Sequence, residues 1–282
     1  MGVDGSSASM RALDWAADGA ALHGLPLRIL HASVWERFEG ATPAEDLPEG
    51  SAEAALLEEI IGAAAARVRE RRPEVGIHAE VLPGEPVDVL FHAAEDAFAS
   101  VVGHRGHGAL VRRLFTDSVG PAVAERASCP VVVVGDSVPV RPRGDRQVVL
   151  GVGEATDAAP GTFALQEAQA RGCDLVVVHA RSRQEARQGS PRLRGSPAVD
   201  ALLSAAVPDR AAPGSGGVVD RRVVDGPARQ ALLRAADHAD LLVLGVRHRR
   251  GTGRRELGAT HRAALRHSPR PVAFVGGPWA SP

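Results

Sequence analysis

Short apolar runs alternate with stretches of helical periodicity along the first half of the chain. Four runs have the length and β-branched content of strands: LRILHA (27–32), IHAEVL (77–82), ASVVG (99–103) and PVVVVG (130–135). Helical periodicity occupies the stretches around them, namely residues 10–20, 52–72, 87–98 and the segment after Ser118. Ser7 or Ser9 is placed to cap the first helix, and Gly24 to end it in the left-handed conformation. Asp14 and Asp18, on that helix, are interpreted as part of a solvated face.

Several of these strands are apolar on both faces instead of alternating. VVVV (131–134) and LVVVH (175–179) show this most clearly. Strands of this kind are typical of a parallel sheet that is covered by helices on both sides. The sequence therefore predicts an α/β fold with a doubly wound parallel, Rossmann-like sheet.

The second half of the chain repeats the first. Residues 93–108 (AAEDAFASVVGHRGHG) align with 235–251 (AADHADLLVLGVRHRRG), and Gly103 matches Gly245. Internal similarity over this length indicates a tandem repeat. We expect two domains, residues 1–136 and 146–282, joined by a linker at 137–145 that is rich in Pro, Gly and charge.

The two copies begin differently. Copy two opens with a full strand, RQVVLGVG (146–153), whereas only three residues precede Asp4 in copy one. A central strand this short would leave backbone groups of its neighbours without ladder partners. We therefore expect the first strand to be truncated and the natural chain to start further upstream.

Composition narrows the classes of partner. The 282 residues carry 33 basic and 34 acidic side chains, which gives no electrostatic reason to expect a nucleic-acid partner. No apolar run approaches the roughly 20 residues of a membrane span, and no signal-peptide pattern opens the chain. Two cysteines, Cys129 and Cys173, are too few for a disulfide framework or a four-thiolate zinc site. We expect a cytoplasmic protein that binds neither nucleic acid nor membrane.

The segment VVGHRGHG (101–108) is the strongest candidate for chemistry. Ligands in open α/β sheets bind beyond the carboxyl ends of the strands. Glycines let backbone amides surround an anion there, and the helix after Ser118 adds its positive N-terminal end. A phosphate site is one reading, and a glycine-rich turn without a ligand is the other. A Walker loop is excluded because the chain contains no Lys.

His104-Arg105-Gly106-His107 also matches the H-x-G-H signature of adenylyl-transferring enzymes. In that family the signature follows the first strand, whereas here it follows the fourth. Two histidines without a third ligand do not predict a metal site. We therefore assign neither catalytic residues nor a metal.

The repeat, GVDGSSASMRALDWAADGA (2–20) and VVGHRGHG…DSVGPAVAERASCPVVVV (101–134) together closely resemble the universal stress protein family in its tandem two-domain form. Family members that bind ATP carry an Asp at the end of the first strand and G-x2-G-x9-G-[S/T] after the fourth. Copy one has Asp4, Gly103 and Gly106. Ten residues instead of nine then precede Asp117, which stands at the motif's glycine position before Ser118.

The resemblance implies an adenine-nucleotide site in the first domain that takes ATP, with or without Mg²⁺. Asp4 would contact the adenine or ribose side, and the backbone of Ala32 the adenine edge. Residues expected near the ribose and phosphates are Gly103, Arg105, Gly106, Ser118 and the amide of Val119. The carboxylate of Asp117 would either repel a triphosphate at short range or hold a magnesium ion.

The second copy departs further from the family pattern. Gly153 stands at the Asp position, His248 replaces the second glycine, and Ala259 replaces the hydroxyl residue. What remains is Gly245, Gly258 and Thr260, from which we expect an empty or very weak second site.

The leading functional reading is a nucleotide-binding regulatory protein of the stress response without a fast reaction of its own. One alternative is a structural or partner-binding stress protein whose two sites have decayed. The other is a slow ATPase or nucleotidyl transferase that uses His104 and His107. The resemblance also implies pseudo-twofold pairing of the two domains through their last strands, 131–134 and 271–275, and leaves further dimerisation open.

Overall fold

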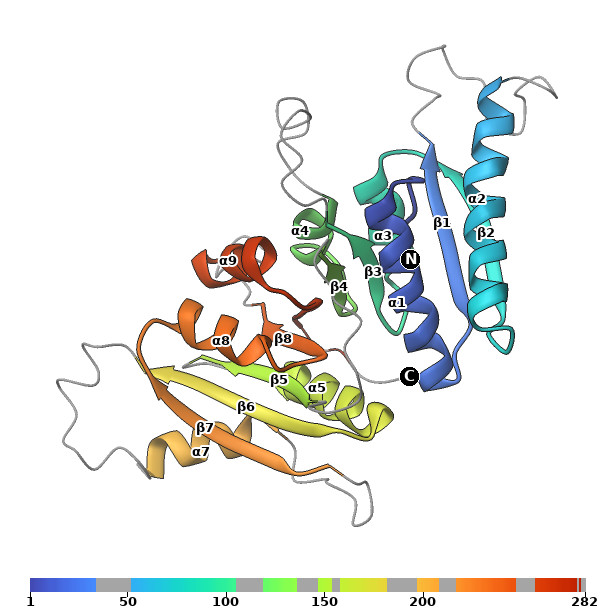
Figure 1. The fold of residues 1–282 in the computed structure, drawn as a ribbon. Coiled ribbons are helices and arrows are strands. Elements are labelled where there is room, and N and C mark those ends of the chain that lie inside the picture. Colours follow the sequence, from blue (N-terminus) through green and yellow to red (C-terminus); the bar gives the residue numbers. More distant parts are fainter. Residues whose placement is uncertain are drawn as a thin grey trace. The chain divides into compact units, whose positions relative to one another are not determined.

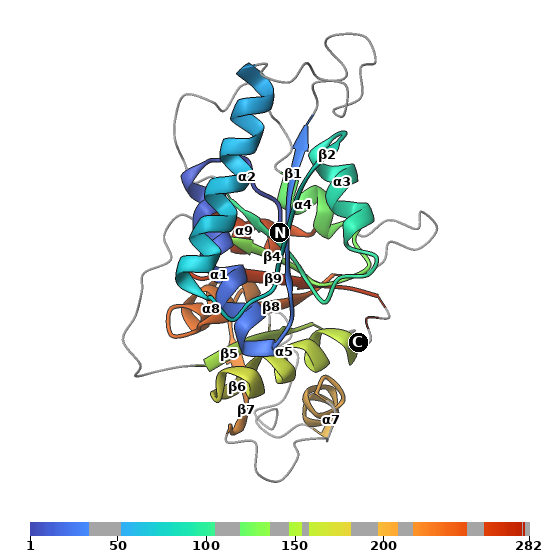
Figure 2. The same ribbon diagram turned by 90° about the vertical axis from the view of Figure 1, so that its right-hand side faces the viewer.

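A computed structural model describes most of the chain, which forms two compact units, unit 1 (1–136) and unit 2 (137–282) (Figures 1 and 2). The described residues are 1–33, 52–104, 119–135, 147–153, 158–181, 197–207, 217–246, 257–277 and 279. The linker expected at 137–145 lies outside them. The expected pairing of the two last strands stays a prediction.

Unit 1 alternates helices and strands as predicted. Its helices are α1 (Ser7–His23), α2 (Ala52–Arg71), α3 (Pro86–Ala93) and α4 (Val119–Ala124). Its strands are β1 (Leu27–Ser33), β2 (Ile77–Pro83), β3 (Ser100–Gly103) and β4 (Val131–Val134). β1 pairs with β2, and β3 with β4, and both pairings are parallel. The parallel α/β prediction is confirmed for this unit.

The first three residues lie between the two strand pairs of unit 1. The N–H of Val3 donates to Leu30 O at 2.8 Å, and the N–H of Leu30 donates to Met1 O at 2.8 Å. On the other side, the N–H of Gly2 donates to Val101 O in β3 at 3.1 Å. This short segment takes the central place of a strand, but it forms only an isolated bridge to Leu30. The expected upstream start of the chain stays a prediction.

Unit 2 has a complete central strand at the same point. Among the described residues of this unit, the strands lie in the order β9-β8-β5-β6-β7, all parallel: β5 (Gln147–Val152), β6 (Asp174–Arg181), β7 (Val219–Asp225), β8 (Leu241–Gly245) and β9 (Val272–Val275). Its helices are α5 (Ala158–Arg171), α7 (Pro197–Ala205), α8 (Ala228–Ala236) and α9 (Ala259–His267). The six residues of β5 occupy the place that Met1–Val3 takes in unit 1.

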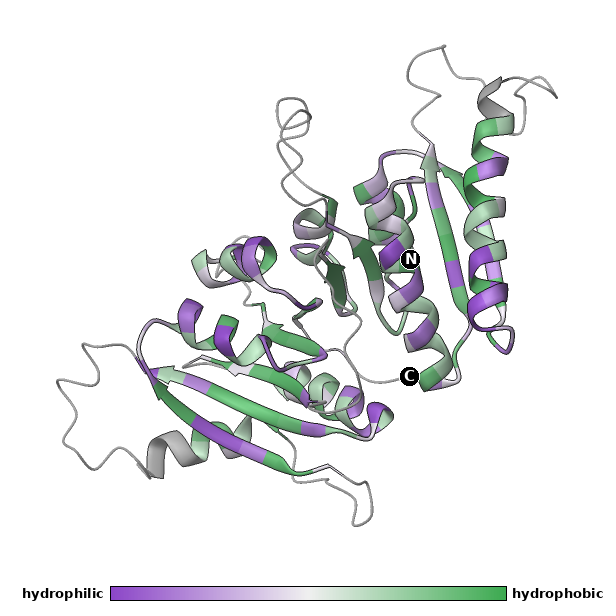
Figure 3. Ribbon diagram, in the orientation of Figure 1, coloured by the Kyte–Doolittle hydropathy of each residue, from purple (hydrophilic) through white to green (hydrophobic). Residues whose placement is uncertain are grey.

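Helices cover both faces of each sheet, as the apolar strands predict. In unit 1, α1 packs with α2 and α3 packs with α4. In unit 2, α8 packs with α9, while α5 lies across the sheet from them (Figures 1 and 2). Figure 3 shows the strands largely green and the helices in both colours. All four residues of β4 and of β9 are buried.

The end of helix α1 was predicted correctly from the sequence, and its N-cap was not. Gly24 ends the helix at φ +64°, as predicted. The N-cap is Ser6 instead of Ser7 or Ser9, and its side chain accepts from the N–H of Ser9 at 3.2 Å. Three serines in four positions offer competing caps, and the sequence pattern does not rank them. The helix predicted at 87–98 is shorter than expected and ends at Ala93.

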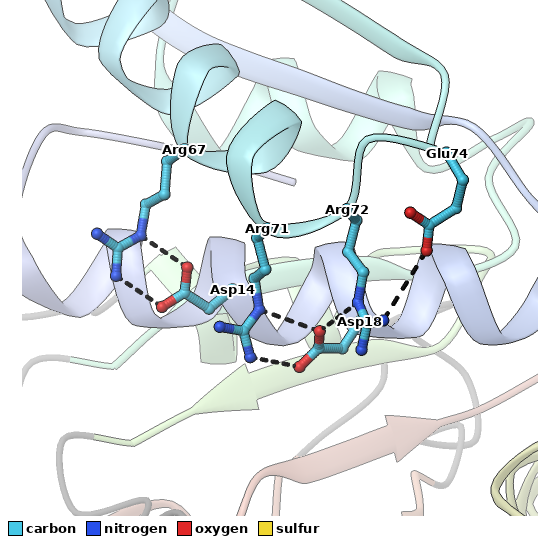
Figure 4. A network of polar contacts seen from close by, with 6 residues as sticks. All are labelled: Asp14, Asp18, Arg67, Arg71, Arg72 and Glu74. Atoms are coloured by element: carbon cyan, nitrogen blue, oxygen red, sulfur yellow. Dashed lines mark hydrogen bonds and ion pairs between the residues drawn. The ribbon is translucent and has the colours of Figure 1, made fainter.

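An ion-pair network joins α1 to α2 (Figure 4). Arg67 donates to both carboxylate oxygens of Asp14 at 2.6 and 2.7 Å. Asp18 accepts from Arg71 at 2.7 and 3.0 Å and from Arg72 at 2.8 Å. Because these carboxylates accept hydrogen bonds, the pKa values of Arg67 and Arg71 are raised above their ordinary range. Asp14 and Asp18 keep 22% and 32% of their side chains exposed, so they belong to a partly solvated face that also pairs with arginines of α2.

Both cysteines are buried free thiols, which agrees with the sequence prediction. Cys173 precedes β6, and burial raises the pKa of its thiol to about 11. The backbone of Gly217 packs against the backbone of Cys173, so closely that a Cβ at Gly217 would lie 2.2 Å from Cys173 O. None of the described helices has both the length and the hydropathy needed to cross a membrane.

The network in Figure 4 gives a stability prediction. Replacing Asp18 with Asn removes the charge that two arginines share, so the free energy of unfolding should fall by about 0.5–1 kcal/mol. Urea unfolding at low and at high salt measures this difference, and the loss should shrink at high salt. Glu59→Gln is the control, because Glu59 is exposed on α2 and forms no ion pair with the described residues. A loss that is equal at both salt concentrations contradicts the electrostatic explanation.

The pKa of Cys173 gives a reactivity prediction. With a pKa of about 11, only about one thiol in a thousand is ionised at pH 8, and the thiolate is the reactive form. Iodoacetamide should therefore label Cys173 at least tenfold more slowly in the folded protein than in urea. Peptide mapping by mass spectrometry reads this cysteine separately from Cys129. Equal labelling rates in the folded protein and in urea would contradict the raised pKa of the Cys173 thiol.

Candidate functional site

The loop between the first three residues and α1 is held by its own polar groups. The carboxylate of Asp4 accepts from the N–H of Ser6 at 3.0 Å, and the N–H of Asp4 donates to Ser9 Oγ at 3.4 Å. Gly5 has φ +76°, a conformation that other residues resist. These contacts place the exposed carboxylate of Asp4 at the N-terminus of α1, where the helix dipole favours negative charge.

Gly103 ends β3 directly against the start of α1. A Cβ at this position would lie 2.7 Å from the carbonyl carbon and oxygen of Ala8 and 2.8 Å from Ser9 N. No other residue fits without moving the helix, so the glycine is explained by packing between β3 and α1. The end of β3 and the loop that carries Asp4 are therefore neighbours.

Two hydrogen bonds fix the end of β1, where Ala32 lies. The Nδ1 of His31 is 2.9 Å from Val3 O. Because a carbonyl only accepts, this ring nitrogen carries the proton. One residue beyond Ala32, Ser33 O accepts from the N–H of Gly84 at 2.9 Å. Ala32 thus lies between a contact to the residue before Asp4 and a contact to the loop before α3.

Helix α4 begins over the ends of β3 and β4. Gly120 is buried there, and a Cβ on it would lie 3.0 Å from Val133 Cγ2 and 3.2 Å from Val102 Cγ2. The N–H of His104 donates to Val134 O at 2.8 Å, which extends the parallel pairing by one residue. Val119 is the first residue of this helix and lies at the same edge of the sheet as Gly103.

Four of the residues predicted for the first site are therefore found at the carboxyl edge of the unit 1 strands: Asp4, Ala32, Gly103 and Val119. The other predicted residues, Arg105, Gly106 and Ser118, lie outside the described residues, as do Asp117 and His107. Within the part of the chain that the structure describes, no group of three potential metal ligands comes together.

Unit 2 repeats this frame with different side chains. The Nδ1 of His179 is 3.0 Å from Val152 O, the counterpart of the contact between His31 and Val3. Gly153 follows where unit 1 has Asp4. Of the weak second site, Gly245 ends β8, Gly258 precedes α9 as its N-cap, and Thr260 lies in its first turn. His248 lies outside the described residues.

Sequence reasoning missed His261, which joins these two glycine positions. Its Nδ1 accepts from the N–H of Gly258 at 3.1 Å, and its Nε2 is 2.9 Å from Gly245 O. A signal for it exists, because 117–134 aligns with 258–275 without a gap and sets His261 opposite Gly120. The alignment alone does not tell that the ring turns back to the end of β8.

This fold, repeated once and with its polar loops at the carboxyl edge, matches a known family. The universal stress protein family matches residues 1–135 and 146–276, and the chain belongs to it. Universal stress protein Rv2623 of Mycobacterium tuberculosis is 31% identical over 275 residues, which cover 89% of this chain and 86% of that protein. Universal stress protein Mb2028c of Mycobacterium bovis is 30% identical over 296 residues, which cover 96% and 94% of the two chains.

A solved structure supports the same fold. The crystal structure of a universal stress protein from Archaeoglobus fulgidus has a TM-score of 0.67 and 18% identity, and covers 98% of this chain and 96% of that chain. The tandem arrangement predicted from the internal repeat is therefore confirmed at the level of family and fold.

The contact of Gly103 with α1 gives a stability prediction. Gly103→Ala should lower the free energy of unfolding by about 1–3 kcal/mol, because the added methyl group meets backbone atoms that cannot rotate away. Urea unfolding followed by tryptophan fluorescence measures the change. The control is Gly62→Ala on α2, where a Cβ meets nothing within 4 Å and Ala should stabilise the helix by about 0.5–1 kcal/mol. A neutral Gly103→Ala would contradict the packing argument.

Proposed function

We propose that unit 1 binds an adenine nucleotide, ATP with or without Mg²⁺, and that the protein acts as a nucleotide-dependent regulator in the stress response. The convergence of Asp4, Ala32 and Gly103 on one edge of the sheet carries this proposal. In open α/β sheets this edge is where ligands bind. Membership in the universal stress protein family agrees with it.

The backbone of Ala32 suits the edge of a purine. In a parallel strand the N–H and C=O of every second residue point to the same side. Those of Leu30 bond to Met1–Val3, so those of Ala32 face the same side, just past Val3. There the chain continues as the loop of Asp4, and Val3 O accepts from His31 instead. The Ala32 peptide groups can therefore offer one donor and one acceptor, which is what an adenine edge needs.

Asp4 suits the ribose side of the same ligand. Its carboxylate is exposed, and the Ser6 N–H holds it in one orientation. A carboxylate accepts hydrogen bonds from hydroxyl groups, and a charged acceptor gives a stronger bond than a neutral one. The ends of β3 and the start of α4 then remain for the phosphates.

A titration of ATP with magnesium against the purified protein tests the proposal. Isothermal calorimetry should give a micromolar dissociation constant, and Asp4→Ala should weaken it by about 10- to 100-fold, the worth of a hydrogen bond to a charged group. The control is Asp14→Ala, which removes a carboxylate of the same unit that Arg67 holds against α2. Equal affinity in Asp4→Ala and wild type would overturn the assignment of the site.

The same preparation separates the other two functions. Absence of heat at millimolar ATP favours a structural or partner-binding protein whose sites have decayed, as the glycine at position 153 and His261 suggest for unit 2. Phosphate release that disappears in His104→Ala favours slow hydrolysis. ATP binding without such release favours a regulator that binds ATP and does not hydrolyse it.

A further inference from the structure

The imidazole of His261 uses both of its nitrogen atoms within unit 2. Nδ1 lies 3.1 Å from the N–H of Gly258, so it must be the unprotonated acceptor. Nε2 lies 2.9 Å from the carbonyl oxygen of Gly245, so it must carry the proton. The ring is therefore neutral, in a single tautomer, and joins the end of β8 to the start of α9. The ring of Phe274, on β9, lies behind it at 5.9 Å between centroids.

The Gly258 N–H, which donates to His261, is a group that could otherwise bind an anion. The first N–H groups of a helix have no partner inside the helix, and an anion at a helix N-terminus binds to them. Here the imidazole nitrogen takes the place of such an anion. The same ring spans Gly245 and Gly258, the two positions that the family motif sets beside the phosphates.

Unit 1 cannot make this contact. Its residue at the equivalent position is Gly120, which has no side chain and packs on Val102 and Val133. The strand ends themselves are alike in the two units, because the N–H of His104 bonds to Val134 O and the N–H of Val246 bonds to Val275 O, both at 2.8 Å. The difference between the two helix starts is therefore the imidazole and not the backbone frame.

We propose that His261 is an intramolecular occupant of the phosphate position in unit 2 and confines nucleotide binding to unit 1. The proposal rests on the proposed function for the identity of the excluded ligand, a polyphosphate. It gives a second reason for weak binding in unit 2, besides the glycine that stands at position 153 in place of the family's Asp. The His261 ring itself takes the place of the anion. His261 is thus a specificity-determining residue that makes the two units unequal.

The first test asks whether the His261 ring holds both hydrogen bonds in solution. We call this arrangement, with the ring in the phosphate position, closure. Long-range proton–nitrogen NMR spectra of the full chain at neutral pH should show a neutral His261 with Nε2 protonated and Nδ1 as a hydrogen-bonded acceptor. His267, exposed in the last turn of α9, is the histidine of the same helix against which the His261 signals are compared. A His261 ring with Nδ1 protonated, or one that averages between two tautomers, would overturn the proposal.

The second test opens the position with a probe that needs no adenine contact. Inorganic tripolyphosphate is titrated against wild type, His261→Ala and the matched control His267→Ala, and backbone amide shifts of Gly258 and Thr260 are followed. His261→Ala should bind at this point about tenfold more tightly than wild type or the control, because one competing hydrogen bond is removed. Equal affinity in all three proteins refutes closure by the ring. If His261→Ala does not fold, His261→Gln is used instead. It keeps an acceptor for the Gly258 N–H but lacks the ring that Gly245 O holds in place, so it should bind more tightly than wild type by a smaller factor.

The two proposals fail in different ways. If unit 1 binds no nucleotide, the amides of Gly103 and Val119 stay unperturbed in every variant, while the ring spectra and the response of Gly258 still report on closure. If closure is wrong, ATP still perturbs unit 1, and His261→Ala leaves the Gly258 amide as it was.

Discussion

The unit 1 sheet depends on three backbone hydrogen bonds that hold Met1–Val3 between β1 and β3. The N–H of Val3 donates to Leu30 O, the N–H of Leu30 donates to Met1 O, and the N–H of Gly2 donates to Val101 O. They connect the two strand pairs of the unit, and they fix the point at which the chain leaves the sheet. Asp4 begins there, and the Ala32 peptide faces the loop at the same point because the central segment has ended. The geometry of the candidate site follows from this end point.

The two units preserve this frame and differ in the side chains placed on it. His31 and His179 hold the carbonyl at the end of the central segment in the same way, at 2.9 and 3.0 Å. A contact kept in both units belongs to the frame. The differences are Asp4 against Gly153, and Gly120 against His261, and both lie at the carboxyl edge of the strands, where we propose the nucleotide site. The two units thus share one backbone frame, and they differ in the side chains at the strand ends.

Under the proposed function, this difference would leave one nucleotide site per chain. A protein with one binding site per chain follows a simple saturation curve, because the chain has no second site of the same kind to which the first is coupled. In unit 2 the N–H of Gly258, just before α9, donates to the imidazole of His261.

The sequence by itself determined the parallel α/β class, the repeat, most of the helices and strands, and the glycine that ends α1, because these depend on periodicity and on local backbone preference. It also indicated Asp4 and Gly103 through family resemblance. Tertiary structure decided that Asp14 and Asp18 pair with arginines of α2, that Gly103 is required by Ala8, and that His261 folds back to Gly245. Each of these contacts joins residues that are distant in the chain or depends on the direction of a side chain. Local patterns carry no information on either, since both are set only when helix and strand ends pack together.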